Sequence, residues 1–369
     1  MKDKLSSLDV KYLLQDLQFL LGARLDTIAK HDTLWCLEFY VPSKGKQFMS
    51  IALGKYFYAS AEKPDANKQE TENLILYLRK YLGGTLLQSI SQIDAERILK
   101  LTFQLKDTKY ILIIEMFSKG NIILCDKDMK IMRALENQSF KDRQIKSGVL
   151  YDYPKSKYNL FSQNSQKFSS VIKENPKDSI VKNLAIDIGM GGVYAEEACL
   201  RAGIDKHAPS VSDKGLKQLF AAVKGMVEGQ QDAAIISTES NELLDVVPIT
   251  LKLYQDKKAK KFESFNAAVA SSFSQYTPKK ESKYDKEIRK IEKIIEQEKQ
   301  KLLELEKQEL VEKAKAEALY TKYQLIDEIL TEIKKARQKY SWKEIKEKLK
   351  EHKIIKDVNE REGKIEIEF

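Results

Sequence analysis

The residues best suited to chemistry in this sequence are three glycines, Gly189, Gly191 and Gly192, in the run 184–198. A short helix, a Gly-x-Gly turn and a second helix that starts near Gly192 form the pattern of a helix-hairpin-helix. Glycine permits backbone angles that a side chain forbids, and the second helix begins with unpaired N–H groups. Such a corner can hold a nucleic-acid phosphate. A tight helical corner in which glycine serves packing alone fits the pattern as well, so both interpretations stay open.

Histidine and cysteine are too scattered to indicate a metal or catalytic centre. The sequence has three of each, and the cysteines are odd in number, widely spaced and set in apolar stretches. They make no disulfide framework and no Cys-x-x-Cys pair, so a reducing cytosol is the simplest compartment for them. We therefore expect no metal, no cofactor and no histidine-based catalysis. These residues are His31, His207, His352, Cys36, Cys125 and Cys199.

The charge balance favours an acidic partner. The 369 residues include 64 Lys and Arg against 55 Asp and Glu, which gives a net charge of +9 and an isoelectric point near 9.0. A basic surface binds nucleic acid by neutralising phosphates and releasing counterions, although a Lys-rich solvated surface gives the same balance. Apolar residues make up 42% of the chain. No apolar run approaches the ~20 residues of a membrane span, so we expect no membrane partner.

Residues 1–171 are predicted to form an α+β domain with a duplicated plan. An amphipathic helix comes first, with Ser6 placed to cap it and Asp9 placed to complete a capping box. Alternating strand-like runs follow, then a helix at about 68–82 that ends at Gly83-Gly84, then a second set of runs. The predicted strands are 34–41, 47–53, 56–60, 85–93, 97–105, 110–117 and 121–126.

Residues 172–275 are predicted to form a second, mixed domain around the glycine turn. It contains a strand at 246–255 and a short helix at 265–273. A polar linker at 274–283, which includes Pro278, then marks a boundary.

Residues 276–336 predict one long coiled-coil helix. Apolar residues recur in alternating steps of four and three from Tyr284 to Ile333, interrupted by Glu298, Glu309 and Glu312. About fifty residues at 1.5 Å each would span roughly 75 Å. The heptad seam so formed cannot face water alone.

Residues 337–369 contain no second long heptad helix to cover that seam. They predict a short amphipathic helix at 341–349 around Trp342 and a strand at 363–369. Either the long helix self-associates, or an antiparallel partner helix belongs to sequence beyond Phe369. Because the chain stops within a predicted strand, we expect truncation.

Motifs along the whole chain resemble those of the NFACT family, the ribosome-associated quality-control factors often called fibronectin-binding proteins. The Ser-Leu-Asp start and the Lys-Gly-Asn-Ile-Ile-Leu motif resemble the archaeal and eukaryotic branch. The motifs that carry the resemblance lie at 6–10, 78–84, 95–98, 117–124, 189–197, 247–249, 262–267 and 323–329.

This resemblance implies a fold. An NFACT-N domain similar to the formamidopyrimidine-DNA-glycosylase fold would be followed by a helix-hairpin-helix domain. A coiled-coil arm with a small middle domain at its tip and an NFACT-R domain would complete the protein. This chain would end within the middle domain, before the return helix and NFACT-R.

The resemblance also implies a function. Family members bind the large ribosomal subunit obstructed by peptidyl-tRNA. They recruit charged tRNA, mainly alanine tRNA in prokaryotic members, for untemplated extension of the stalled nascent chain. Because the ribosome itself performs peptide transfer, the resemblance implies a cytoplasmic factor that is not an enzyme.

Three tRNA-recruiting positions of the family correspond to Asp9, Glu96 and Arg97, with Glu96 in place of the usual aspartate. The extra methylene shifts that carboxylate, which puts the role of Glu96 in question. The Arg97 guanidinium can clamp a phosphate or a guanine edge, while a carboxylate can orient it or accept from a base amine. Alternatively, Asp9 only caps its helix, and Glu96 and Arg97 form a surface ion pair.

Five further residues are candidates for tRNA contact. Glu115, Met116 and Phe117 match a family stretch that is thought to face tRNA. Arg79 and Lys80 lie near the end of a predicted helix, where they can instead complement its dipole.

Three other functions make different demands on the sequence. A DNA-repair glycosylase needs an N-terminal proline amine, whereas this chain starts Met1-Lys2-Asp3 and has no zinc-finger cysteines. A fibronectin-binding adhesin is supported by no signal peptide, anchor motif or repeat. A DNA- or RNA-binding helix-hairpin-helix scaffold with a coiled coil remains open. In its form without nucleic-acid affinity, the coiled-coil scaffold predicts no salt-dependent tRNA binding.

Overall fold

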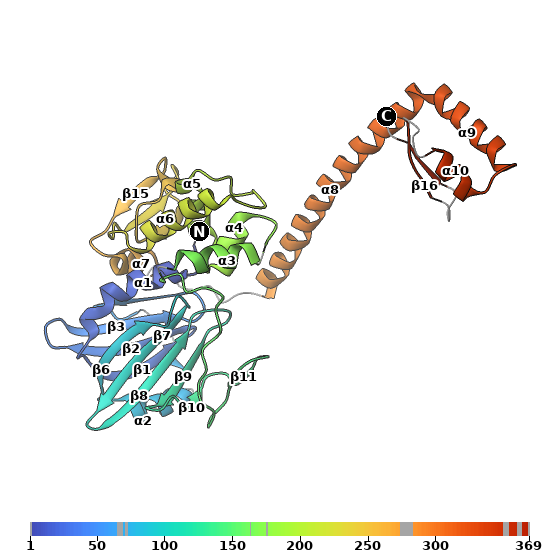
Figure 1. Ribbon diagram of the computed structural model, residues 1–369. Coiled ribbons are helices and arrows are strands. Elements are labelled where there is room, and N and C mark those ends of the chain that lie inside the picture. The colour runs from blue at the N-terminus through green and yellow to red at the C-terminus, as the bar shows by residue number, and fades with distance from the viewer. Residues whose placement is uncertain are drawn as a thin grey trace. The chain divides into compact units, whose positions relative to one another are not determined.

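The computed structural model of the chain describes residues 2–64, 69–70, 73–162, 164–174, 176–273, 283–349, 354–359 and 364–367. The chain divides into two units, Met1–Pro278 and Lys279–Phe369 (Figure 1). His352 and nearly all of the predicted linker at 274–283 fall outside the described residues.

An antiparallel sheet of ten strands forms the centre of the first unit. Its strands are β1 (Arg24–His31), β2 (Leu34–Val41), β3 (Gly45–Ala52), β4 (Tyr56–Ser60), β5 (Gln69–Glu70), β6 (Leu86–Gln92), β7 (Ile98–Leu105), β8 (Thr108–Glu115), β9 (Asn121–Asp126) and β10 (Ile131–Ala134). The order is β10-β9-β8-β7-β6-β1-β2-β3-β4, with β5 beside β1. Two consecutive meanders therefore meet where Arg24 pairs with Leu86.

Each meander follows a helix, α1 (Ser7–Asp16) or α2 (Asn73–Leu82). A capping box starts α1: the Ser6 hydroxyl accepts from the Asp9 N–H, and the Asp9 carboxylate accepts from the Ser6 N–H. The end of α2 is followed by Gly84 at φ +78°, a backbone angle that favours glycine. The predicted alternation of helix and meander and the predicted cap are both confirmed.

Several details of this region differ from the prediction, and β5 and β10 are among the strands that were not predicted. Strand β1 was not predicted, because its polar residues show no clear alternation. Helix α2 begins at Asn73 rather than near residue 68, since Gln69 and Glu70 pair with β1.

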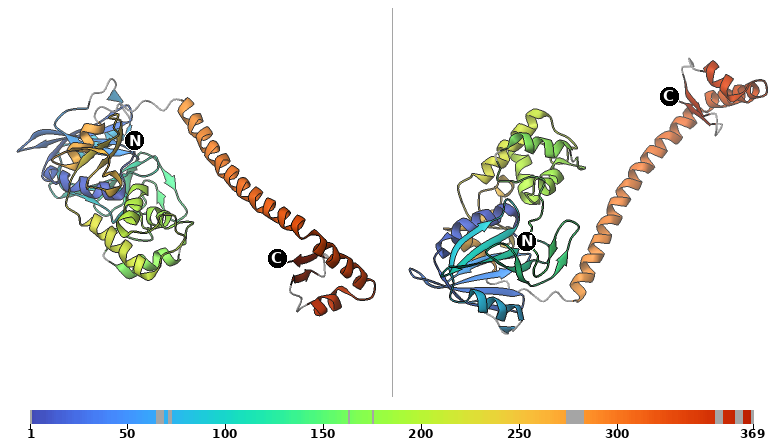
Figure 2. Two further views of the ribbon diagram at one scale, coloured as in Figure 1. Left: turned by 90° about the horizontal axis from the view of Figure 1, so that it is seen from above. Right: turned by 60° about the horizontal axis from the view of Figure 1, so that its bottom comes forward.

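The rest of the first unit is mainly helical. The helices α3, α5 and α6 gather beyond one end of the sheet, with α1 between them and the sheet (Figures 1 and 2). One buried core runs from Leu5 to Phe273 and includes residues of both sheet and helices. The domain boundary at 171–172 stays a prediction. The elements are β11 (Gln138–Ser139), β12 (Gln144–Ile145), α3 (Ser165–Glu174), α4 (Ile180–Lys182), a π-helical turn (Asn183–Asp187), α5 (Gly192–Ala202), α6 (Asp213–Val227), β13 (Ala234–Ser237), β14 (Leu243–Val247), a 3-10 helix (Lys252–Tyr254), β15 (Lys258–Lys261) and α7 (Phe265–Phe273).

The predicted strand at 246–255 is wrong beyond Val247. Proline has no N–H for a strand ladder, so Pro248 favours an end to pairing there. The Glu197 carboxylate then accepts from the N–H groups of Lys252 and Leu253, at 2.9 and 3.0 Å, where the 3-10 helix begins. The short helix predicted at 265–273 is confirmed as α7.

In the second unit, a long helix leads into a small group of elements. These are α8 (Lys283–Thr321), α9 (Tyr323–Arg337), α10 (Trp342–Leu349), β16 (Ile355–Asn359) and β17 (Lys364–Ile367). The short amphipathic helix and the terminal strand are confirmed as α10 and β17, while β16 was not predicted.

The prediction of one helix through residues 276–336 is wrong, because the helix breaks at Lys322 (φ −111°, ψ 21°). Beyond the break, α9 buries Ile329 and Ile333 with Ile355, while Leu330 of the predicted seam is 42% exposed. The core of the small elements therefore buries Ile329, which lies outside the predicted seam, together with the seam residue Ile333. In α8, described seam residues such as Leu302 stay exposed within this unit, so the coiled coil stays a prediction.

Candidate nucleic-acid interface

A cleft of about 560 Å³ opens in the first unit where several segments meet. They are the start of α1, the turn between β6 and β7, the glycine turn before α5, and the stretch 155–158 with Lys177. Four predicted residues line it: Glu96, Arg97, Gly189 and Gly191. The fold thus brings together two motifs that lie about ninety residues apart in the sequence.

Arg97 and Glu96 supply half-buried charges to this cleft. Neither side chain makes a hydrogen bond or an ion pair with any residue that the structure describes. Burial lowers the pKa of Arg97 and raises the pKa of Glu96, and in each case the charge of the other residue opposes the shift. A guanidinium donor and a carboxyl acceptor are therefore available side by side to a ligand.

Three lysines that the sequence analysis missed, Lys155, Lys157 and Lys177, also line the cleft. The buried Asp187 carboxylate lies 2.7 Å from the Lys157 ammonium and 4.0 Å from the Lys177 ammonium. With Arg97, the lining holds four cations against the two acids Glu96 and Asp187, so it favours an anionic ligand. The nearby run Lys155-Ser-Lys157 was the local signal for this charge.

The glycine turn forms another part of the cleft lining. Gly189 and Gly191 have φ of +81° and +78°, angles that side chains rarely adopt. Gly191 is the N-cap of α5, and no side chain caps the helix there. Gly192 starts α5 but does not line the cleft. The corner is present as predicted, with an irregular first helix; its assignment as a helix-hairpin-helix stays a prediction.

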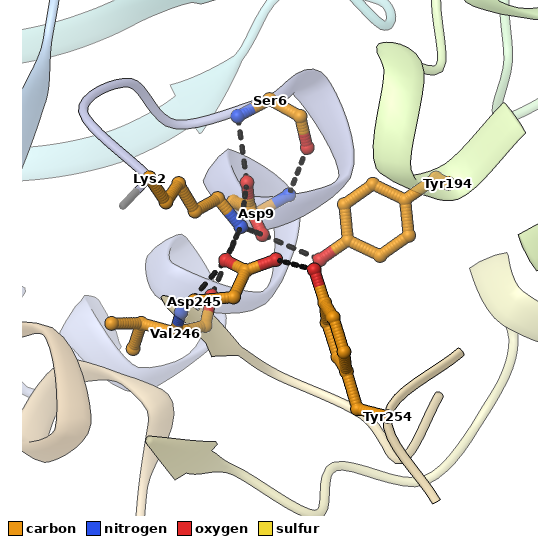
Figure 3. Close-up of polar contacts among 7 residues, drawn as sticks. All are labelled: Lys2, Ser6, Asp9, Tyr194, Asp245, Val246 and Tyr254. Atoms are coloured by element: carbon orange, nitrogen blue, oxygen red, sulfur yellow. Dashed lines mark hydrogen bonds and ion pairs between the residues drawn. The ribbon is translucent and has the colours of Figure 1, made fainter. Parts of the chain in front are cut away.

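Asp9 lies next to the cleft but is fully buried (Figure 3). One carboxylate oxygen accepts from the Tyr194 hydroxyl at 2.6 Å, and the other accepts from the Ser6 N–H at 2.7 Å. The Lys2 ammonium lies 2.9 Å from each oxygen. Asp9 therefore has no oxygen atom open to a ligand.

Lys2 connects Asp9 to a second buried carboxylate, Asp245 (Figure 3). Its ammonium lies 3.3 Å from Asp245 and donates to the Val246 carbonyl at 2.9 Å. The Tyr254 hydroxyl donates to the other oxygen of Asp245 at 2.8 Å. Burial acts to lower the pKa of Lys2, but the two carboxylates outweigh it and raise that pKa. We call these residues the Lys2 cluster: Lys2, Asp9, Tyr194, Asp245 and Tyr254.

Glu115 is the centre of another buried group, the Glu115 cluster of Glu115, Arg143 and Tyr151. Its carboxylate accepts from the Arg143 guanidinium and from the Tyr151 hydroxyl, both at 2.7 Å. Burial acts to lower the pKa of Arg143, but Glu115 outweighs it and raises that pKa. Met116 is also buried, and Phe117 is half-buried. The stretch nevertheless adjoins the cleft, because the Met116 N–H donates to the Arg97 carbonyl at 2.7 Å.

Arg79 and Lys80 do not line the cleft. They belong to α2, which lies at the end of the sheet away from α3 (Figure 1). The Arg79 guanidinium donates to the Ile28 carbonyl at 2.6 Å, and the exposed Lys80 ammonium lies 5.5 Å from the Tyr81 ring centre. The fold thus separates these two predicted residues from Glu96 and Arg97.

Two absences can be stated for the described ranges. No group of three or more His, Cys, Asp or Glu side chains there is arranged to hold a metal ion. None of the helices in those ranges combines the length and the apolar character that crossing a bilayer requires.

Comparison with known sequences identifies relatives along the whole chain. An archaeal Rqc2 homolog from Methanocaldococcus jannaschii is 31% identical over 388 residues, which cover 99% of this chain and 58% of the relative. Ribosome quality control complex subunit 2 of Saccharomyces cerevisiae is 31% identical over 189 residues, which cover 50% of this chain and 17% of the relative. The chain thus spans little more than half the length of its archaeal relative.

Two solved structures share the fold. The fibrinogen binding protein from Staphylococcus aureus has a TM-score of 0.59 at 19% identity, covering 74% of this chain and 99% of its own. The N-terminal part of the fibronectin/fibrinogen-binding protein from Streptococcus suis has a TM-score of 0.56 at 21% identity, with coverage of 73% and 99%. The family model for the NFACT N-terminal and middle domains matches residues 6–366. This match across nearly the whole sequence shows that the chain belongs to the NFACT family.

Proposed function

We propose that this chain is a ribosome quality-control factor that binds RNA without catalysis. It would bind the large ribosomal subunit obstructed by peptidyl-tRNA and recruit charged tRNA, with alanine tRNA as the first candidate. The recruited residue would extend the stalled nascent chain without a template, in the cytoplasm. The names of the archaeal and yeast relatives, and membership of the NFACT family, support this proposal.

The observation that carries the proposal is the half-buried Arg97 in a cationic cleft. A guanidinium that is partly removed from water and has no partner among the described residues gains from a ligand that supplies acceptors. Phosphate oxygens and base edges are suitable acceptors for its planar set of donors. Glu96 beside it can accept from the amino group of the same base.

The shape of the site favours an unpaired nucleotide. A volume of about 560 Å³ is that of a small-ligand pocket, too small for a duplex. Sequence-specific recognition of RNA mostly uses unpaired bases, as in the loops of tRNA. The uncapped N-terminus of α5 and the cleft lysines would then hold the adjoining phosphates.

The test is tRNA binding by wild type and Arg97→Ala across a series of salt concentrations. If Arg97 contacts a base, the variant should bind about 1–3 kcal/mol more weakly with little change in salt slope. If it contacts a phosphate, the slope should fall by about one. Lys109→Ala is the control for charge, because it also removes one cation, here an exposed one near the opposite end of the β7–β8 hairpin.

Two outcomes would contradict the proposal. Equal affinity of Arg97→Ala and Lys109→Ala would remove the cleft from tRNA binding. Competition by duplex DNA as effective as competition by unlabelled tRNA would favour a general nucleic-acid scaffold instead.

A further inference from the structure

Two walls of the cleft come from distant parts of the sequence and need a means of alignment. The first wall combines the start of α1 with the turn that carries Arg97. The Ser7 hydroxyl donates to the Ala95 carbonyl, and the Gln92 amide donates to the carbonyls of Ser7 and Glu96 at 3.0 and 2.9 Å. The α1 start and the Arg97 turn therefore form one bonded piece.

The second wall is the glycine turn, and Asp9 joins it to the first. Tyr194, which donates to Asp9, lies in the first turn of α5, three residues after Gly191. A Cβ atom placed on Gly191 would lie 3.6 Å from the Cβ of Ser6, so the two walls are in van der Waals range. Asp9 also accepts from the Ser6 N–H. One carboxylate thus bonds to both walls.

The Lys2 ammonium compensates the negative charge that Asp9 brings to this junction. Asp9 and Asp245 are both buried, and the Lys2 ammonium lies within ion-pair distance of each. A buried carboxylate without a cation is strongly unfavourable. Lys2 therefore stabilises Asp9 in its position between the walls.

We infer that Asp9 and Lys2 are positioning residues that act through Tyr194 to set the separation of the Arg97 wall and the glycine turn. Asp9 itself makes no contact with RNA. The expected effect on tRNA binding rests on the proposed function. The alignment of the two walls does not, because it is a property of the free protein. The two can therefore be tested separately.

The first experiment needs no RNA. Hydrogen exchange of the whole chain should show faster exchange at amides 189–194 in both Asp9→Asn and Tyr194→Phe than in wild type. Asp16→Asn is the matched control. It removes the same charge from the same helix, where Asp16 accepts from the Asn266 N–H at 2.8 Å and from the Gln231 amide, away from the glycine turn. Wild-type exchange at 189–194 in Asp9→Asn, or an equal increase in Asp16→Asn, would overturn the inference.

The second experiment is a double-mutant cycle on tRNA affinity. If Asp9 acts through Tyr194, Asp9→Asn and Tyr194→Phe should each weaken binding about 3- to 10-fold. The double variant should then have the same tRNA affinity as the single variant that binds tRNA less tightly. If Asp9 touches RNA, the two losses should multiply, and the inference is wrong.

Two comparisons separate this inference from neighbouring explanations. Lys2→Arg, which keeps the charge, should retain more affinity than Lys2→Met at equal folded fraction; equal losses would remove Lys2 from the positioning role. Arg97→Ala should leave exchange at 189–194 unchanged. If Arg97→Ala binds tRNA as wild type does, the proposed function fails, while the exchange experiment still decides whether Asp9 aligns the walls.

Discussion

The Lys2 cluster and the Glu115 cluster are both built on a carboxylate that the family resemblance assigns to tRNA binding, yet both carboxylates are buried. They differ in how far apart their residues lie in the sequence and in their ratio of carboxylates to cations. The Lys2 cluster joins residues from 2 to 254 and has two carboxylates for one cation, whereas the Glu115 cluster spans only 115–151 and has one for one. The difference indicates that the first cluster holds separate parts of the unit together, while the second joins the end of β8 to residues 143–151, which follow it closely in the sequence.

The largest effect on stability is expected for Lys2→Met, because it leaves two buried carboxylates without a cation. Removing one partner of a buried ion pair costs about 3–5 kcal/mol. The free energy of unfolding in urea should fall by that amount. Lys2→Arg should lose less than half as much, and equal losses for the two variants would show that packing rather than charge is responsible.

A smaller loss is expected for Arg143→Met, about 2–3 kcal/mol, because a single carboxylate loses its cation and keeps the Tyr151 hydroxyl. Hydrogen exchange should rise in the β11–β12 hairpin, which carries Arg143, and stay unchanged at 189–194. A rise at both places would mean that the two clusters are not independent, and the comparison would fail.

Tyr254→Phe should lower the free energy of unfolding by about 1 kcal/mol, because it removes one hydrogen bond to the buried Asp245 carboxylate. Tyr153→Phe is the control, since that hydroxyl makes no hydrogen bond with the described residues. Thermal or urea unfolding should show little change in the control. Equal effects in the two variants would remove Tyr254 from the Lys2 cluster.

The smallest effect on stability is expected at Glu96, which lines the cleft, in contrast to the buried carboxylates Asp9 and Glu115. Burial raises the pKa of Glu96 above its ordinary 4.5, so the folded state binds this proton more readily than the unfolded state. Its contribution to stability is present below pH 4.5 and is lost as the pH rises through the raised pKa. Glu96→Gln should therefore stabilise the protein at pH 7 by less than about 1 kcal/mol and have no effect near pH 4. Destabilisation at pH 7 would place Glu96 with Asp9 and Glu115.

Local patterns predicted local structure well. Ser6 and Asp9 are three residues apart, so their capping box is readable from spacing alone, and α7 follows from a short apolar run. Heptad spacing predicted α8 but not its end, because burial of Ile329 against Ile355 decides the structure beyond Lys322. The local sequence pattern does not show that a contact with a distant strand competes with the heptad repeat.

The candidate site was predictable only in part. Arg97 and the glycine turn were identified by their motifs, and the fold places both in one cleft. Neither Lys2 nor Asp245 could be identified, because their contact joins residues more than two hundred positions apart and leaves no trace in the spacing of either segment. The same long range explains why Asp9 reads as a candidate contact residue in the sequence and as a buried residue in the structure.

The residues of the Lys2 cluster lie far apart in the sequence, so the cluster can form only late in the synthesis of the first unit. Lys2 leaves the ribosome early, but Asp245, with which it pairs, is made 243 residues later. At roughly 5–20 residues per second, that interval is roughly 12–50 s. The α1 start and the glycine turn can bond through Asp9 once Tyr194 has been made, but Asp245 and Tyr254 join them only later. A nascent copy of this chain therefore has no complete Lys2 cluster until nearly the whole of its first unit has been translated.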